Sequence, residues 1–266
     1  MKKAISIILM LTIVFSLFSV PCYASDDIFS TSGDISSPNN DSDSSNTNDD
    51  ISTASNNTFG GPYGSRPARP EVIAEWRATH NEAAELAALR ATLNLDSANA
   101  TWINLYGFTY YAQELCDTCG PATVRMTLRA LTGSAPTESA ARIGCNWVCG
   151  VGTYMVDCTD YLNDEQSVYT YYDMYSTLKD SWDYNLYSAI NDGAPAIVGI
   201  AITVSDGWFY DTCGHAISIY GVMSDISKYM IADPWGGYVN QPTWQQYTKS
   251  SSALWEAYDS NQGYIA

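Results

Sequence analysis

The chain has 266 residues, and its 29 Asp and Glu residues outnumber 12 Lys and Arg, giving a net charge of −17. Such acidity disfavours nucleic acid and anionic lipid as partners, because both would repel a negative surface. The length is sufficient for one domain with a sizeable core after a leader and a linker are set aside.

Residues 1–24 have the pattern of a secretory signal peptide. Lys2 and Lys3 precede a nearly continuous apolar run over residues 4–20, and a small-residue cleavage site follows near Ala24. The run is also close to the length of a membrane span, so a retained anchor is the alternative. We expect cleavage, because polar sequence follows at once and no other segment could span. The mature protein is therefore predicted to be secreted, with association to the cell envelope left open.

Residues 25–60 are rich in Ser, Asn and Asp and contain no basic residue. They offer too little apolar surface to offset the entropy of ordering, so we predict a disordered linker. Residues 61–266 then form one folded domain, which we expect to be monomeric.

Helical signals dominate the first half of this domain. Residues 70–93 carry apolar side chains at helical spacing, and Pro70 suits the first position of a helix. Residues 102–113 are aromatic and read as extended. A second helix is expected from about Cys119 to a C-terminal Gly133, with a short helix around Ser139.

The second half is predicted to supply most of the strands. A helix ends at 191–193, and strands are expected over 195–202, 215–223 and 228–232, the last followed by a turn at Asp233. Helices come first and strands last, which favours an α+β fold over repeated βαβ units.

The pair Cys116-x-x-Cys119 allows three kinds of chemistry. With Cys145 and Cys149 it loosely resembles a four-thiolate zinc site, although the spacing is wide and an exported chain tends to oxidise its thiols. Cys119 at a helix start also fits a redox couple, but the preceding sequence lacks the βαβ pattern of such proteins. The third possibility is that Cys119 is a lone nucleophile, which requires a base and a group to orient it.

Only two histidines can supply that base. His80 lies within a predicted helix with no motif around it, and we interpret it as a packing or surface residue. His215 begins an alternating strand, where its side chain can point into a cleft. Asp233 ends the next strand, and a short hairpin would bring its carboxylate beside the imidazole. Gln113, six residues before Cys119, is a candidate oxyanion donor together with the backbone N–H of Cys119.

These motifs in this order resemble the papain-like cysteine peptidases. Q-x5-C-G-P-A at a helix start, G-H before a strand and D-P-W after the next strand are most similar to the bacteriocin-processing peptidases, which cut leaders after a double glycine, and their stand-alone relatives. The resemblance covers residues 105–245. It implies a helical lobe packed on an antiparallel sheet, with Cys119 as nucleophile, His215 as base, Asp233 as orienting carboxylate and Gln113 as oxyanion donor.

The resulting hypothesis is a secreted cysteine hydrolase that cleaves peptide or isopeptide bonds in a peptide or protein substrate, with no cofactor or metal. The processing peptidases are usually fused to a transporter and work inside the cell, so leader cleavage is not expected here. The alternatives are a transglutaminase-like acyl transferase, a cell-wall amidase, or a non-catalytic binding module on the same fold. We expect Cys116 to form a disulfide with one of Cys145, Cys149, Cys158 and Cys213. The sequence does not select the partner; a bond to Cys213 would brace the two sides of the site.

Overall fold

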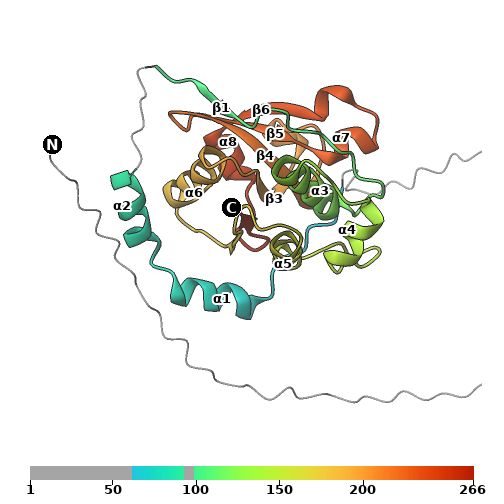
Figure 1. Cartoon of the computed structure of the whole chain (residues 1–266), viewed down its shortest axis with the longest axis horizontal. Helices are drawn as coiled ribbons and strands as arrows, with labels where there is room; N and C mark the ends of the chain where they lie inside the picture. The colour runs from blue at the N-terminus through green and yellow to red at the C-terminus, as the bar shows by residue number, and fades with distance from the viewer. Residues whose placement is uncertain (1–61, 93–98) are drawn as a thin grey trace, which may run out of the picture. The chain divides into compact units, whose positions relative to one another are not determined.

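The computed structural model describes residues 62–92 and 99–266 (Figure 1). The predicted signal peptide and linker, residues 1–24 and 25–60, lie outside the described residues. Within 62–92 and 99–266, no helix is both long and apolar enough to cross a bilayer.

The single helix expected over residues 70–93 is wrong, because two helices occupy this stretch. Helix α1 covers Pro70–Thr79 and α2 covers Glu82–Thr92. His80 between them is extended, with φ −104° and ψ 129°. The side chain of Asn81 accepts the backbone N–H of Ala84 at 3.2 Å and so caps a new helix, which explains the break.

One antiparallel sheet of seven strands organises the described domain. The strands follow the order β2-β7-β3-β4-β5-β6, and β1 pairs with β4 beyond the end of β3. Their bounds are Trp102–Asn104 for β1, Asp173–Met174 for β2, Ala196–Ile202 for β3, Thr212–Met223 for β4, Lys228–Ala232 for β5, Gln246–Ser250 for β6 and Tyr264–Ile265 for β7. Strands β3, β4 and β5 confirm the three predicted strands, whereas β6 and β7 carry no predicted pattern.

Helices pack against both faces of this sheet (Figure 1). The helices that follow α2 are α3 Cys119–Thr132, α4 Glu138–Gly144, α5 Met155–Glu165, α6 Lys179–Asn191, α7 Pro234–Tyr238 and α8 Ser251–Ala257, with two 3-10 turns at Val204–Asp206 and Pro242–Trp244. Ile197 of β3 lies in the core cluster that contains α3 and α5 residues, and its neighbour Val198 lies in the cluster with α6 and α8 residues. The alternation follows from the two-residue period of a strand.

Helix α3 ends as the sequence predicts. Gly133 adopts φ 74°, in the left-handed region, and its N–H donates to the carbonyl of Arg129. Nine of the first ten residues of α3 are buried, so the helix that begins at Cys119 is one of the central elements of the core. The nucleophile candidate is therefore mounted on a rigid element.

Candidate active site

Cys119 is the first residue of α3, and its side chain is fully buried. Its Sγ accepts a hydrogen bond from the backbone N–H of Ala216 at 3.3 Å. Ala216 follows His215 in β4, so this bond fixes the thiol against the strand that carries the histidine. The N–H of Cys119 itself belongs to the first turn of α3, where backbone donors have no acceptor within the helix.

His215 and Asp233 are joined by a hydrogen bond of 2.8 Å between Nε2 and Oδ1, and both side chains are fully buried. The predicted hairpin is responsible. Strands β4 and β5 pair antiparallel with Ser218 opposite Ala232, which brings the start of one strand beside the end of the other. The second ring nitrogen of His215, Nδ1, is buried and has no hydrogen-bond partner among the described residues. A free Nδ1 is available for a proton exchange.

The electrostatic surroundings favour a charged imidazole at this position. Burial disfavours the imidazolium, but the negative charge of Asp233 and the interaction with Cys119 outweigh it and raise the pKa of His215 to about 9. Cys119 lies near enough to His215 to contribute to this rise in pKa through its charge. The imidazolium form of His215 is therefore favoured at neutral pH.

Asp233 is held by three further donors that sequence reasoning does not identify. Its Oδ1 also accepts the N–H of Trp235 at 3.0 Å, and its Oδ2 accepts the hydroxyls of Tyr210 and of Tyr247, the latter at 2.9 Å. Burial and the nearby charge of Asp233 raise the pKa of both tyrosines well above the usual value, so both remain neutral donors. These contacts fix the carboxylate in one orientation.

Gln113 lies close to this group but its side chain faces its own loop. Its backbone N–H donates to the carbonyl of Pro234 at 3.2 Å, and its Nε2 donates to the carbonyl of Leu115 at 2.7 Å. The side-chain oxygen Oε1 is buried without a partner among the described residues. The structure therefore brings Gln113 beside the residue that follows Asp233, with one amide hydrogen already used.

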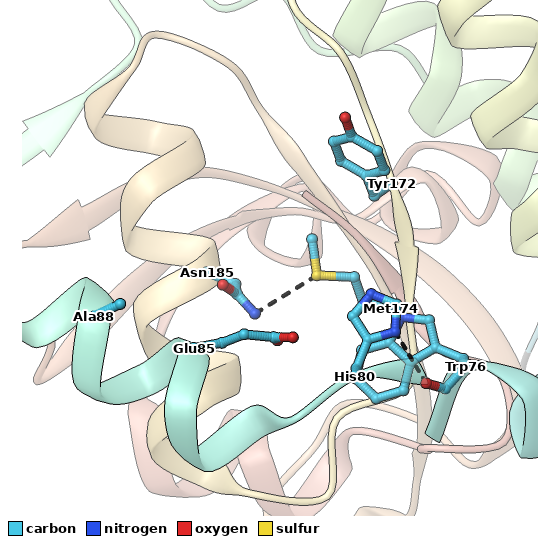
Figure 2. Close-up of a pocket in the computed structure, with 7 residues that line it drawn as sticks. All are labelled: Trp76, His80, Glu85, Ala88, Tyr172, Met174 and Asn185. Carbon is cyan, nitrogen blue, oxygen red and sulfur yellow. Dashed lines mark hydrogen bonds between the residues drawn. The ribbon is translucent and has the colours of Figure 1, made fainter. Parts of the chain in front are cut away.

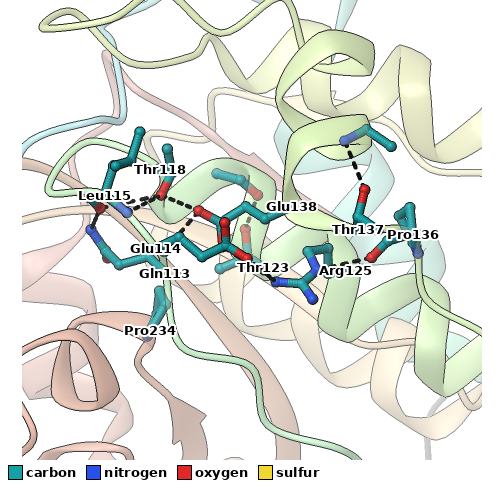
Figure 3. A network of polar contacts seen from close by, with 12 residues as sticks. Gln113, Glu114, Leu115, Thr118, Thr123, Arg125, Pro136, Thr137, Glu138 and Pro234 are labelled. Atoms are coloured by element: carbon teal, nitrogen blue, oxygen red, sulfur yellow. Dashed lines mark hydrogen bonds and ion pairs between the residues drawn. The ribbon is translucent and has the colours of Figure 1, made fainter.

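A buried carboxylate fixes the loop between Gln113 and Cys119 (Figure 3). Glu138, at the start of α4, accepts the N–H of Glu114 at 2.8 Å and the hydroxyl of Thr118. It also forms an ion pair with Arg125 of α3 at 3.3 Å. Burial raises the pKa of Glu138, and the bonds from Thr118 and Glu114 partly oppose that rise. The network ties the loop before the nucleophile to two helices.

The two cysteines of the C-x-x-C pair point to different partners. The Cys116 thiol donates to the hydroxyl of Tyr63 at 3.5 Å, whereas Cys119 is held by Ala216. All six cysteines among the described residues have free thiols, so no bond from Cys116 to Cys213 is present and that disulfide stays a prediction. In the described part of the chain, no three His, Cys, Asp or Glu side chains are placed to hold a metal ion.

A separate apolar cavity of about 580 Å³ lies between the α1–α2 pair and the body of the domain (Figure 2). Trp76 and His80 stack there with ring centroids 4.4 Å apart, and Met174 and Asn185 form the opposite wall. None of the four candidate site residues lines this cavity. His80 thus belongs to a packing arrangement, as its sequence context indicates.

The family model described as the Peptidase_C39 like family matches residues 105–262, which is more than half of the chain. The chain belongs to this family. Membership makes it a cysteine peptidase, a class whose substrates are peptides. The α+β fold with helices packed on an antiparallel sheet, expected from the sequence, is confirmed by the structure. The match includes all four candidate site residues.

Solved structures that are similar to this Peptidase_C39 like chain have low sequence identity to it. The peptidase domain of Streptococcus ComA, a bifunctional ABC transporter involved in a quorum sensing pathway, is 15% identical, covering 60% of this chain and 96% of that one with a TM-score of 0.43. A double glycine motif protease from an AMS/PCAT transporter is 14% identical, covering 59% and 88%, with a TM-score of 0.38. Digestive procathepsin L 3 from Tenebrio molitor is 15% identical, covering 73% and 87%, with a TM-score of 0.43. No curated protein is significantly similar to this chain.

Proposed function

We propose that this cysteine peptidase hydrolyses peptide or isopeptide bonds with Cys119 as nucleophile, His215 as acid and base, and Asp233 as the orienting carboxylate. The observation that carries the proposal is a buried chain of contacts: Asp233 bonds to His215, and the next residue in the strand, Ala216, donates its N–H to the sulfur of Cys119. Such a chain activates a thiol and holds the imidazole in the orientation that proton transfer needs.

The reaction begins with the thiolate of Cys119 attacking the carbonyl carbon of the scissile bond. Negative charge then develops on the carbonyl oxygen, and the N–H of Cys119 and the amide of Gln113 are the donors proposed to stabilise it. For this role the Gln113 amide must use its second hydrogen or leave the Leu115 carbonyl when substrate binds.

Collapse of the tetrahedral intermediate breaks the carbon–nitrogen bond. His215 transfers the proton on Nδ1 to the leaving amine, which departs and leaves an acyl group on the Cys119 sulfur. Water then attacks the thioester while the neutral imidazole accepts its proton, and the thiol ester bond breaks to release the acid. Asp233 keeps Nε2 occupied throughout, so that Nδ1 remains the nitrogen that exchanges protons.

A peptide library digested with the purified protein tests this function. Mass spectrometry of the products is expected to find new termini with wild type and with Cys149→Ala, which removes an exposed thiol. Cys119→Ala and His215→Ala are expected to produce none. Cleavage that survives Cys119→Ala would refute the proposed nucleophile. The absence of cleavage both by wild type and by Gly64→Val, a variant that displaces residues 62–69 from the site, would favour a non-catalytic binding module.

Export is a second element of the proposal. Residues 1–24 combine a basic start, an apolar run and a small-residue site, which is the pattern that export machinery recognises and cleaves. N-terminal sequencing of protein recovered from the culture medium is expected to begin near residue 25. Recovery of the full-length chain from the membrane fraction would instead support a retained anchor.

A further inference from the structure

The segment of residues 62–69 lies against the proposed active site. Its backbone donors reach the loops on both sides of the site: the N–H groups of Gly64 and Ser65 donate to the carbonyl of Gly214 at 3.0 and 3.4 Å, and that of Tyr63 donates to the carbonyl of Cys116 at 3.4 Å. Gly214 immediately precedes His215, and Cys116 lies three residues before Cys119. The segment thus bridges the two elements that carry the histidine and the thiol.

Thr153 holds the other edge of this segment. Its N–H donates to the carbonyl of Gly64 at 2.7 Å, and its carbonyl accepts the N–H of Arg66 at 2.9 Å. The segment therefore runs as a short extended strand between Gly214 and Thr153, with parallel bridges to each. Thr153 also packs on the residue after the nucleophile, since a Cβ on Gly120 would lie 2.2 Å from its Oγ1.

The strand lies in a slot between Gly214 and Thr153, and this slot is narrow at Gly64. A Cβ at that position would lie 2.5 Å from the carbonyl oxygen of Asp117, a backbone atom that cannot swing away. The opposite wall is equally close, because a Cβ on Gly152 would lie 2.0 Å from the carbonyl oxygen of Gly64. Glycine is the residue that permits this approach of one backbone to another.

At residue 66, two positions after Gly64, the surroundings of the slot favour a positively charged side chain. The guanidinium of Arg66 lies over the ring of Tyr154 at 3.9 Å. Residues 62–70, PYGSRPARP, contain two arginines and no acidic residue in a chain with a net charge of −17. Attraction of the cation to the ring and to the acidic surface stabilises the segment in the slot.

The reacting groups are closed off while the segment is in place. Cys119 and His215 are both fully buried, so a substrate carbonyl has no access to the sulfur. Peptidases that bind extended substrates pair the substrate backbone with strand edges beside the nucleophile. The backbone groups of Thr153 and Gly214 that face the slot can pair with one strand at a time, and residues 62–69 already occupy them.

Contacts within the slot occupy two carbonyl oxygens of the segment. Two of its carbonyl oxygens have acceptor roles away from Gln113: that of Pro62 accepts the hydroxyl of Thr212, and that of Gly64 accepts the N–H of Thr153. Neither oxygen is therefore free for the proposed oxyanion donors.

We propose that the slot between Thr153 and Gly214 is the peptide-binding groove of the active site and that residues 62–69 occupy it as a built-in inhibitor. The groove takes an extended peptide with glycine at the position of Gly64 and a positively charged side chain at that of Arg66. The proposal rests on the function proposed above. The segment must leave the groove before a substrate peptide can pair in its place.

The test displaces the segment in the full chain with Gly64→Val. The rate of Cys119 alkylation by iodoacetamide is expected to rise about tenfold or more over wild type, because the thiol becomes accessible in a larger fraction of molecules. Ala74→Val, which introduces the same side chain on the exposed face of α1, is the control and should react like wild type. Thr212→Val removes the hydroxyl that donates to Pro62 and accepts the N–H of Gly214. This variant introduces no clash with the segment, so a smaller increase is expected, and it replaces Gly64→Val if that variant does not fold.

A synthetic peptide of residues 62–70 tests the groove itself. In a Gly64→Val chain that also carries Cys119→Ala, the peptide PYGSRPARP should bind by fluorescence anisotropy, and PYVSRPARP should not. If the peptide binds but the Gly64→Val chain cleaves no peptide, the proposed groove is supported and the proposed hydrolase function is refuted. The built-in inhibitor would be refuted if wild type, Gly64→Val and Thr212→Val cleave peptides at the same rate, if the three chains are alkylated at the same rate and if the synthetic peptide does not bind. The proposed hydrolase function would still hold in that case.

Discussion

The backbone N–H of Ala216 donates to the sulfur of Cys119 at 3.3 Å, so the first residue of α3 is fixed against the second half of the domain. Ala216 follows His215 in β4, and the same strand therefore positions the imidazole and anchors the thiol. A helix from the first half of the domain and a strand from the second pack against each other here, and this bond joins them at the thiol.

The alkaline limit of peptide hydrolysis should be set by His215. Because its pKa is raised to about 9, the imidazolium persists through neutral pH and loses its proton as pH rises through that value. We expect kcat/KM to fall above about pH 9, since the leaving amine then lacks its acid. Asp233→Asn removes the charge that raises the pKa, so the limit should move to lower pH. A limit unchanged in Asp233→Asn would contradict the orienting role.

Gln113 should matter for hydrolysis but not for alkylation. Gln113→Ala is expected to lower kcat by about 100-fold, the loss typical of one oxyanion donor. Alkylation of Cys119 by iodoacetamide forms no oxyanion, so its rate should stay near that of wild type. Parallel losses in both reactions would mean that Gln113 supports the loop instead of the oxyanion.

Tyr247 is predicted to be a positioning residue for Asp233. Tyr247→Phe removes one hydroxyl from Oδ2 and should lower kcat about tenfold with KM unchanged, the equivalent of one hydrogen bond to a charged group. Asp233 would then act more strongly on His215, and the alkaline limit should move to higher pH. Tyr220→Phe is the control, because that ring stacks on Phe108. A purely structural role would leave the pH limit unchanged.

Glu138 should stabilise the loop before the nucleophile. Glu138→Ala leaves the N–H of Glu114, the hydroxyl of Thr118 and the Arg125 guanidinium without their buried acceptor, and we expect a loss of about 3 kcal/mol in the free energy of unfolding. Chemical denaturation measures it, with exposed Glu71→Ala of α1 as the control. A loss no larger than that of Glu71→Ala would show that the network carries no stability.

The predictions from sequence succeed where the contacts are local. His215 and Asp233 are 18 residues apart on one hairpin, and the lengths of the two strands suffice to bring them together. Gly133 ends α3 for a reason visible in its own backbone freedom. Asn81, by contrast, divides a stretch that apolar spacing alone joins into one helix, because its capping bond competes with helix continuation.

Contacts between distant segments could not be predicted in this way. Tyr247 reaches Asp233 from β6, a strand of mixed polarity with no clear alternation, and Tyr210 does so from an irregular loop. The segment that begins at Pro62 has a composition typical of a linker, and its pairing with Gly214 depends on how the whole domain packs. No local pattern encodes either arrangement.

The most direct test of the account is the rate of Cys119 alkylation by iodoacetamide at pH 6 in His215→Ala and His80→Ala. The chain has two histidines, and His80 packs on Trp76 in a separate cavity, so the pair is matched. At pH 6 the raised pKa keeps His215 positively charged, and that charge stabilises the thiolate. We predict that His80→Ala reacts like wild type and that His215→Ala reacts at least about tenfold more slowly. Equal rates in the two variants would contradict the proposal that His215 activates Cys119.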